Sequence, residues 1–324
     1  MDLVTLIPAF KPQYLPDLLN CLRLQTRPSG RIIFSDDTPD GRYRDALFSE
    51  ALAPLRTGLP IECHDGPRNG AWANFLSLLE TWGGSSPFVH LLLDDDVLYP
   101  PFYERHALAH ASASLSCSIS ARWTASDAGM PLGGLPVPPM VAGHPNRMLS
   151  LDADVVFGTT VAHCRNWFGE FSNAVFRRDA ALALRKPQIG GVSYAGLWDL
   201  GAFMASSLIA PVGYLQDALG YFRTSPSGNS AQAAGPYVKG AHLGYAALAL
   251  GGWRAGRYTQ DQARTVFATL AHALAQRFAS QPDVLAFLPS LGAMAAAPPD
   301  SPAAAEAQAQ FVELWTAFQR LHQF

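Results

Sequence analysis

The chain of 324 residues is 49% hydrophobic and 15% charged, and its formal net charge is −3. That length allows one large α/β domain or two lobes with a sizeable core. The slight negative charge argues against a broad basic face for nucleic acid or anionic lipid, and no apolar run is long enough to predict a membrane span. Four widely spaced cysteines without a CxxC pair predict reduced thiols in a cytoplasmic protein, with a peripheral position at the inner membrane face left open.

Strand and helix patterns alternate through the first part of the chain. Apolar strand patterns are found at 3–7, 31–35, 61–63 and 88–93. Apolar residues with helical spacing lie between them, at 15–22, more weakly at 43–55, and at 72–79. This alternation predicts a mostly parallel sheet flanked by helices, with right-handed crossovers.

The pattern loosens after Pro101. Helices are expected at 106–113, within 176–184 and at 196–209, and strands at 115–123, 155–157 and 218–223. A stretch rich in proline and glycine, 129–146, predicts a long loop. The tail after Gly256 is predicted to be helical, with a capping box formed by Thr259 and Gln262.

The last predicted helix follows a linker at 298–305 and carries an apolar stripe. Its members recur at helical spacing: Phe311, Leu314, Trp315, Phe318 and Leu321. Such a stripe predicts core packing or a subunit interface, so the C-terminal helices are a candidate homodimer contact. A separate pair, His106 and His110, has the i, i+4 spacing of zinc ligands, but no HExxH motif or cysteine partner accompanies it, which favours an exposed helix face.

Three consecutive acids, Asp94 to Asp96, follow the apolar run from Val89 to Leu93. Adjacent carboxylates repel one another unless a cation or solvent compensates their charge. The ends of strands in open α/β sheets are where ligands bind, and carboxylate oxygens there suit Mg²⁺ or Mn²⁺ that also contacts a phosphorylated ligand. The alternative is a simple turn whose last aspartate caps the following helix.

The ends of four predicted strands carry polar residues. They are the segments 8–11, 36–38, 64–66 and 94–96. Because parallel strands end at one edge of the sheet, these groups should converge on one crevice, where Asp36 or Asp37 could accept hydrogen bonds from a base or ribose. The sequence has no P-loop and no GxGxxG after a strand, so a metal would have to compensate phosphate charge.

Several of these segments resemble, in order and spacing, the family 2 glycosyltransferases of the GT-A fold. They are Leu3–Phe10, Gln25-Thr26, Ile33–Gly41, Arg68–Gly70, Asn74 and Leu93–Asp96. The resemblance implies an α/β fold: a GT-A-like, Rossmann-type, mostly parallel sheet flanked by helices, with a C-terminal helical extension. It implies a catalytic domain at 1–230, with a nucleotide-sugar half at 1–110 and an acceptor half at 111–230, and an extension at 231–324.

This resemblance also implies an activity: the inverting transfer of a sugar from a UDP-, GDP- or dTDP-linked donor to a hydroxyl of a glycan or glycolipid. Bacterial surface-polysaccharide synthesis is the expected setting, and Mn²⁺ or Mg²⁺ the expected cofactor. The implied metal ligands are Asp94 and Asp96, the outer acids of a DxD motif. The implied nucleotide-sugar contacts are Pro8, Ala9, Phe10, Asp36, Asp37, Arg68, Asn69, Asp94 and Asp95.

The second half resembles the family more loosely. Three segments match in order: 173–179, 198–203 and 218–226. The second implies Asp199 as the general base, and an inverting transfer needs such a carboxylate to take the proton of the acceptor hydroxyl. A helix N-terminal acid near the macrodipole is the alternative for Asp199, and Asp152 and Asp154 are rival acids. Ser225 stands where the family often has a histidine that assists the metal.

Two other functions remain open from the sequence. A sugar-nucleotide pyrophosphorylase would use a similar sheet, but it needs a glycine-rich, basic loop after the first strand, and Pro8–Pro12 is not one. A catalytically weak or inactive relative that only binds the nucleotide sugar is compatible with Ser225 in place of histidine.

Overall fold

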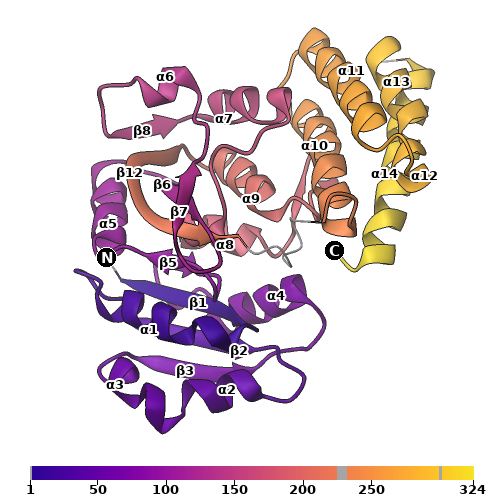
Figure 1. Cartoon of the computed structure of the whole chain (residues 1–324). Coiled ribbons are helices and arrows are strands. Elements are labelled where there is room, and N and C mark those ends of the chain that lie inside the picture. Colours follow the sequence, from indigo (N-terminus) through magenta and orange to yellow (C-terminus); the bar gives the residue numbers. More distant parts are fainter. Residues whose placement is uncertain (1, 225–231, 299–300) are drawn as a thin grey trace. The chain divides into compact units, whose positions relative to one another are not determined.

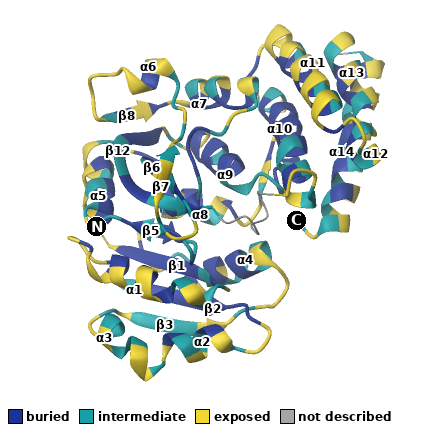
Figure 2. Cartoon of the chain, in the orientation of Figure 1, coloured by how far each residue is buried: buried dark blue, intermediate teal, exposed yellow. Residues whose placement is uncertain are grey.

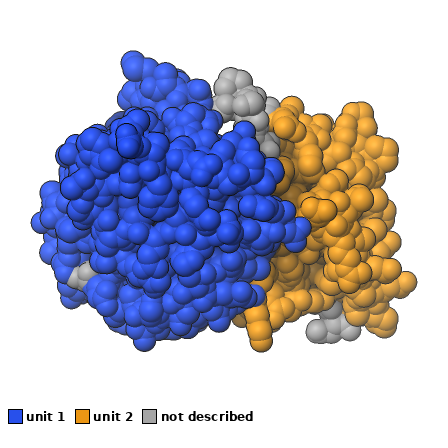
Figure 3. Space-filling model, turned by 90° about the horizontal axis from the view of Figure 1, so that it is seen from below, with its two compact units in different colours: residues 1–152, 167–185, 206–225 blue, residues 153–166, 186–205, 226–324 orange. Residues whose placement is uncertain are grey.

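The computed structural model describes residues 2–224, 232–298 and 301–324. The chain forms two compact units, shown in different colours in Figure 3. The first comprises residues 1–152, 167–185 and 206–225, and the second comprises residues 153–166, 186–205 and 226–324. The chain therefore passes between the units several times. The predicted division at residue 230 stays a prediction.

The first unit is built on a sheet whose strands follow the order β3-β2-β1-β4-β9-β6-β12-β5, with β7 beside β6 and β8 beside β12 (Figure 1). The strands are β1 (Leu3–Ala9), β2 (Arg31–Asp36), β3 (Ile61–Asp65), β4 (Phe88–Leu91), β5 (Val97–Leu98), β6 (Cys117–Ala125), β7 (Pro131–Gly134), β8 (Met148–Leu151), β9 (Ala174–Arg177) and β12 (Val212–Arg223). The pairs β1–β2, β2–β3, β1–β4 and β6–β12 are parallel. The predicted, mostly parallel α/β sheet is confirmed.

The central strands are buried on both faces, as the dark blue of β1 and β2 in Figure 2 shows. On one face, Leu3 and Ile7 of β1 share a core with leucines of α1 (Leu15–Arg23) such as Leu18. The opposite face of β1 carries the buried residues Val4 and Leu6, and α4 (Ala71–Trp82) packs on β1 and β2. Helix-covered parallel strands explain why these segments are continuous apolar runs and not alternating ones.

Two sequence predictions for the helices and loops of the first unit are corrected. The weak helix expected at 43–55 is two helices, α2 (Arg42–Leu47) and α3 (Ala53–Arg56), because Pro54 lacks an amide hydrogen and starts a new helix. The expected loop 129–146 contains β7 and α6 (Pro139–Ala142). The helices α5 (Phe102–Ser112) and α8 (Arg178–Ala183) complete this unit.

The second unit is mainly helical. Its elements are α7 (Ala153–Thr159), α9 (Trp198–Ser207, whose last two residues belong to the first unit), α10 (Pro236–Arg254), α11 (Gln260–Arg277), α12 (Pro282–Leu285), α13 (Leu288–Ala296), α14 (Pro302–His322) and the hairpin β10 (Gln188–Ile189) and β11 (Val192–Ser193). The strand expected at 155–157 is wrong, since these residues lie in α7. The helical tail and the capping box of Thr259 and Gln262 are confirmed.

The apolar stripe of α14 is largely core of the second unit. Phe311, Trp315 and Phe318 are buried, and the Trp315 indole donates a hydrogen bond to the Ser193 carbonyl at 2.8 Å. Leu321 is exposed. Dimerisation through these helices stays a prediction. Among the described residues, no helix is both long and apolar enough to cross a membrane.

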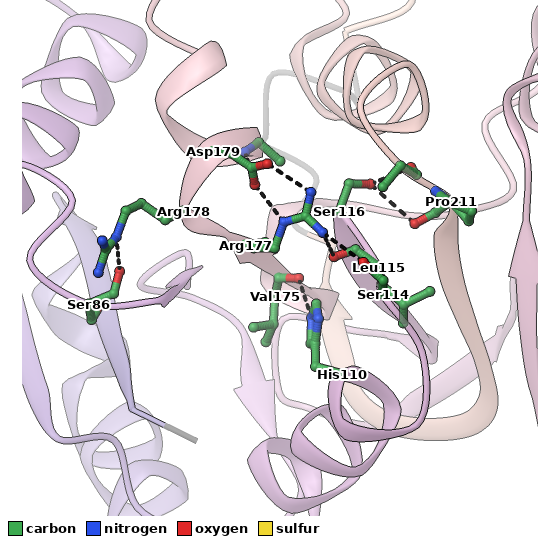
Figure 4. A network of polar contacts seen from close by, with 12 residues as sticks. Ser86, His110, Ser114, Leu115, Ser116, Val175, Arg177, Arg178, Asp179 and Pro211 are labelled. Atoms are coloured by element: carbon green, nitrogen blue, oxygen red, sulfur yellow. Dashed lines mark hydrogen bonds and ion pairs between the residues drawn. The ribbon is translucent and has the colours of Figure 1, made fainter.

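The junction between β9 and α8 is held by a polar network (Figure 4). The Arg177 guanidinium forms two hydrogen bonds of 2.7 Å with the Asp179 carboxylate and one of 3.1 Å with the Leu115 carbonyl. Arg178 donates to the Ser86 carbonyl at 3.0 Å. These charged side chains of the segment 173–179, which the sequence predicts to lie on the acceptor side, thus stabilise the turn from β9 into α8.

The predicted exposed face of α5 is wrong for its two histidines. His106 is buried and its Nδ1 lies 2.6 Å from the Ser118 hydroxyl. His110 Nε2 lies 3.0 Å from the same hydroxyl and 3.3 Å from the Val175 carbonyl. Over the described ranges, no group of three or more His, Cys, Asp or Glu side chains could hold a metal ion.

Buried histidines should make the fold sensitive to acid. Burial lowers the pKa of His90 to about 3 and that of His110 to about 4. An unfolded histidine titrates near pH 6.5, so in acid the unfolded chain binds protons that the folded chain does not. For each of the two, the free energy of unfolding should fall by about 1.4 kcal/mol per pH unit as the pH drops below about 6.5.

Urea unfolding at several pH values between about 7 and 5 measures this slope. Burial also lowers the pKa of His106, so the wild-type slope includes that group as well. His110→Gln removes one of these histidines, so its stability should depend less steeply on pH than that of the wild type. Equal slopes for the two proteins would contradict the assignment.

Candidate functional site

The acids Asp94 to Asp96, called the acid triplet below, follow the end of β4. Asp94 is buried, and its Oδ2 accepts hydrogen bonds of 2.6 Å from the backbone N–H groups of Phe10 and Lys11. Burial, and next the charge of Asp95, raises the pKa of Asp94 to about 6. Asp95 forms an ion pair with the Lys11 ammonium. The end of β1 therefore holds the start of the acid triplet.

Asp96 is the most constrained of the three acids. It is 1% exposed, and its Oδ1 accepts the backbone N–H of Arg223 at 3.1 Å. Its Oδ2 is buried and accepts no hydrogen bond from the residues that the structure describes. Burial, and next the charge of Asp95, raises the pKa of Asp96 well above its ordinary value. A small cavity of about 10 Å³ lies beside it, bordered by Arg122 and Glu170 among others.

Arg223, the last residue of β12, ties the acid triplet to other segments. Its guanidinium donates to the Asp95 carbonyl at 2.9 Å and to the Asp17 carboxylate at 2.9 Å. The same group lies 4.6 Å from the centre of the Tyr14 ring. The Arg223 backbone N–H also binds the Asp96 carboxylate. Arg223 therefore holds the loop of the acid triplet at the backbone of Asp95 and at the side chain of Asp96.

Asp36 closes a turn at the end of β2. Its Oδ1 accepts the Thr38 amide at 2.9 Å and the Thr38 hydroxyl at 2.5 Å, and its Oδ2 accepts the Arg44 amide at 2.9 Å. Both carboxylate oxygens are thus engaged in the turn that leads into α2. The predicted contact of Asp36 with a nucleotide stays a prediction.

Asp37 joins the ends of β2 and β3. Strand register brings Ala9, Asp36 and Asp65 level with one another. Asp37 Oδ1 accepts the Arg68 amide at 2.5 Å, and burial raises the pKa of Asp37. Arg68 has a positive φ of 55° and its side chain donates to the Thr38 carbonyl at 3.1 Å. The sequence expectation that these strand ends share one edge is confirmed.

Gly66 allows this close approach of the two strand ends. A Cβ at Gly66 would lie 2.7 Å from Asp37 Oδ1 and 2.9 Å from the Asp36 carbonyl, which is too close. We therefore expect Gly66→Ala to displace Asp37 and to weaken the nucleotide binding that the sequence predicts, while the protein stays folded. Thermal shift with the best-binding nucleotide measures the loss. Gly133→Ala, where a Cβ meets nothing within 4 Å, is the control, and equal shifts for both variants would contradict this role of Gly66.

The remaining predicted residues occupy different settings. Asn69 is exposed in the loop after β3. Asp199 lies in the first turn of α9, in the second unit, and its role as a base stays a prediction. Of the rival acids, Asp154 is paired with Arg257 at 3.2 Å, and Asp152 directly follows β8. Ser225 lies outside the described residues.

Arg122 and Glu170 form a buried ion pair beside Asp96 that sequence reasoning missed. Arg122 Nε lies 2.7 Å from Glu170 Oε2, Nη2 contacts the other carboxylate oxygen, and Nη1 donates to Thr124 at 2.7 Å. Burial raises the pKa of Glu170, against the effect of Arg122. The only sign of this pair in the sequence was Arg122, a single arginine within an otherwise uncharged strand pattern. That pattern does not show which acid pairs with it.

The chemistry of the site follows from these contacts. Strand-end amides and carboxylates form its edge, and Asp96 Oδ2 is a buried oxygen that accepts no hydrogen bond from the described part of the chain. Such an oxygen is costly unless a proton or a cation meets it. Hard oxygen ligands fit Mg²⁺ or Mn²⁺, which proteins often hold through one or two carboxylates together with substrate phosphates. Asp96 therefore offers one such oxygen, and a divalent cation there would need further ligands from a bound substrate.

Comparison with solved structures gives S. aureus TarS. Residues 1–349 of that protein match at 12% identity and a TM-score of 0.55, covering all of this chain and 91% of that one. The UDP-GlcNAc complex matches at 14% identity and a TM-score of 0.53, covering 100% and 92%. No protein-family model and no curated protein sequence matches the chain. At this identity the likeness concerns the fold alone, and the predicted GT-A-like α/β fold is confirmed.

Proposed function

We propose that this protein is a glycosyltransferase that binds a nucleotide sugar at the ends of β1 to β4 and transfers the sugar to a hydroxyl of a glycan or glycolipid. The observation that carries the proposal is the acid triplet, held against the end of β1, with Asp96 Oδ2 buried and without a hydrogen-bond partner among the residues that the structure describes. Structures of the same fold were solved with UDP and with UDP-GlcNAc, which supports a nucleotide-sugar donor.

The nucleoside of the donor would lie along the strand ends that carry Pro8 to Phe10 and Asp37. Phe10 exposes half of its surface there, and an exposed ring can stack on a base. Asp37 Oδ1 is fixed by the Arg68 amide, so its carboxylate is oriented before a ribose or base arrives. The acid triplet, which the amides of Phe10 and Lys11 join to β1, would then face the diphosphate.

Asp96, together with Asp94, would hold a Mn²⁺ or Mg²⁺ ion. Such an ion, when bound, neutralises the charge that develops on the leaving nucleoside diphosphate. The two amides that bind Asp94 and the Arg223 amide that binds Asp96 fix the orientation of both carboxylates, which would hold the ion. We further propose that the chain is a family 2 glycosyltransferase and that Asp94 and Asp96 are the outer acids of its DxD motif.

Asp199 would act as the general base of an inverting reaction. A carboxylate that accepts the proton of the acceptor hydroxyl lets the oxygen attack the anomeric carbon. Its place in the first turn of α9 fits the predicted position. Synthesis of a bacterial surface polysaccharide is the setting that we propose.

A thermal-shift screen tests the donor. UDP-, GDP- and dTDP-sugars are compared with and without MnCl₂, and one class should raise the melting temperature only when Mn²⁺ is present. A ligand at a hundred times its Kd stabilises the folded state by about 2.7 kcal/mol, which is readily measured. If none of these donors shifts the melting temperature, the proposal is wrong.

The base is tested separately. Asp199→Asn should keep donor binding and lose transfer and donor hydrolysis by about a hundredfold or more. Asp154→Asn, a change at the rival acid that pairs with Arg257, should keep both. The reverse result would move the base to Asp154.

A further inference from the structure

Lys11 contacts the acid triplet through two different atoms. Its backbone N–H donates to Asp94 Oδ2 at 2.6 Å, while its ammonium forms an ion pair with Asp95. The backbone contact belongs to the end of β1 and would survive any side-chain change. A substitution of Lys11 therefore changes the ammonium and leaves the backbone contact in place. The sequence alone predicts no role for this ammonium.

The charges around the acid triplet need a positive partner. The Asp95 carboxylate is paired with the Lys11 ammonium, whereas the nearby Arg223 guanidinium donates to the Asp95 carbonyl and to the Asp17 carboxylate. The side chain of Lys11 is 44% exposed, whereas that of Asp95 is 15% exposed. A half-exposed lysine on a flexible stem can leave its partner at little cost, since surface ion pairs contribute about 0–1 kcal/mol.

A bound divalent cation would make the charge around the acid triplet more positive, and a bound diphosphate would make it more negative. A cation at Asp96 Oδ2, a buried oxygen without a hydrogen bond from the described residues, would add two positive charges next to Asp95, the partner of Lys11, and so weaken the need for the ammonium. A diphosphate bound to that cation would add negative charge next to the acid triplet, which the Lys11 ammonium already contacts through Asp95. An ammonium is a compact point charge with three donors that suits phosphate oxygens.

We infer that the Lys11 ammonium is an internal counter-ion of the acid triplet, which leaves Asp95 for the donor diphosphate when a divalent cation binds. This inference rests on the proposed function and adds a phosphate-binding residue to it. In the free protein Lys11 competes with the cation for the acid triplet. In the complex it binds the diphosphate.

The two roles predict opposite effects of one substitution. Lys11→Met removes the competitor, whose ion pair is worth at most about 1 kcal/mol, so MnCl₂ alone should bind up to about fivefold more tightly than it does to the wild type. The same variant loses a charge-assisted hydrogen bond to phosphate, so the nucleoside diphosphate selected by the screen above should bind about tenfold more weakly with Mn²⁺ present. Isothermal titration calorimetry measures both affinities, and inorganic pyrophosphate replaces the nucleotide as a probe without a base.

Two further variants control the result. Lys11→Arg keeps the charge and should keep most of both affinities. Lys186→Met removes an exposed lysine of the second unit and should leave both unchanged. Sodium chloride should shrink the effect of Lys11→Met on the diphosphate, because salt screens exposed charges.

The outcomes separate this inference from the proposed function. If the wild type binds diphosphates with Mn²⁺ and Lys11→Met leaves either affinity unchanged, or moves both in the same direction, the counter-ion role is wrong and the donor site stands. If the wild type binds no nucleotide and no pyrophosphate, the proposed function fails and the phosphate role of Lys11 fails with it. The Mn²⁺ affinity of Lys11→Met still decides the counter-ion role in that case.

Discussion

Asp96→Asn is expected to abolish cation-dependent nucleotide-sugar binding while the protein remains folded and no less stable. The carboxylate is 1% exposed, and burial raises its pKa well above the ordinary value, so the charged form costs free energy in the fold. An amide of the same shape carries no charge, and its oxygen can still accept the Arg223 N–H. It is, however, a weak ligand for a hard divalent cation.

The expected loss of affinity is more than about a hundredfold, which is the upper range for residues that only support a metal ligand. Thermal shift gives two numbers for one protein: the melting temperature alone, and its rise with the selected donor and MnCl₂. For Asp96→Asn the first should be unchanged or higher, and the second should vanish. Asp45→Asn removes an exposed carboxylate from α2 and should leave both as in the wild type. If Asp96→Asn has a lower melting temperature than the wild type, or if Mn²⁺ and donor still raise its melting temperature, Asp96 has a structural role and does not bind the cation.

Much of the first unit could be predicted because its signals are local. Apolar runs of strand length separated by amphipathic helices define β1 to β4, and parallel strands must end at one edge. The errors fall where tertiary context decides. Val155 and Val156 are β-branched and suggest a strand, yet they lie in α7. His106 and His110 look like an exposed pair because the sequence does not show that Ser118 and Val175 pack against them.

The candidate site was predictable only in part for the same reason. The sequence shows that two acids, Asp36 and Asp37, follow the second strand. It cannot show that both carboxylate oxygens of Asp36 accept hydrogen bonds within the turn into α2. The acid triplet is visible in the sequence, whereas the contacts that hold it come from residues 84 and 127 positions away, directly after β1 and at the end of β12. Long-range register decides these contacts, and one sequence alone does not reveal it.

The largest effect on stability is expected at the ion pair of Arg122 and Glu170. Glu170→Gln leaves a guanidinium that is 5% exposed without its counter-charge. Removing one partner of a buried pair costs about 3–5 kcal/mol, a large share of the roughly 5–15 kcal/mol that stabilises a typical domain. Arg122→Met should cost somewhat less, because the Glu170 carboxylate that it leaves without a counter-charge is 20% exposed and partly solvated.

An exposed pair of similar geometry gives the control. Arg31 and Glu62 join β2 to β3 through two hydrogen bonds of 2.6 Å, but their side chains are 34% and 42% exposed. Water screens such a pair, so Glu62→Gln should cost at most about 1 kcal/mol. Burial, and not bond length, therefore sets the difference between the two glutamate variants.

A double-mutant cycle completes the test. The variant with Arg122→Met and Glu170→Gln together has no unpaired charge, so it should recover a large part of the loss that either single change causes. Urea unfolding followed by circular dichroism gives the free energies of the four proteins. Additive losses at Arg122 and Glu170, or a Glu62→Gln variant as unstable as Glu170→Gln, would show that charge pairing is not what holds this part of the sheet beside Asp96.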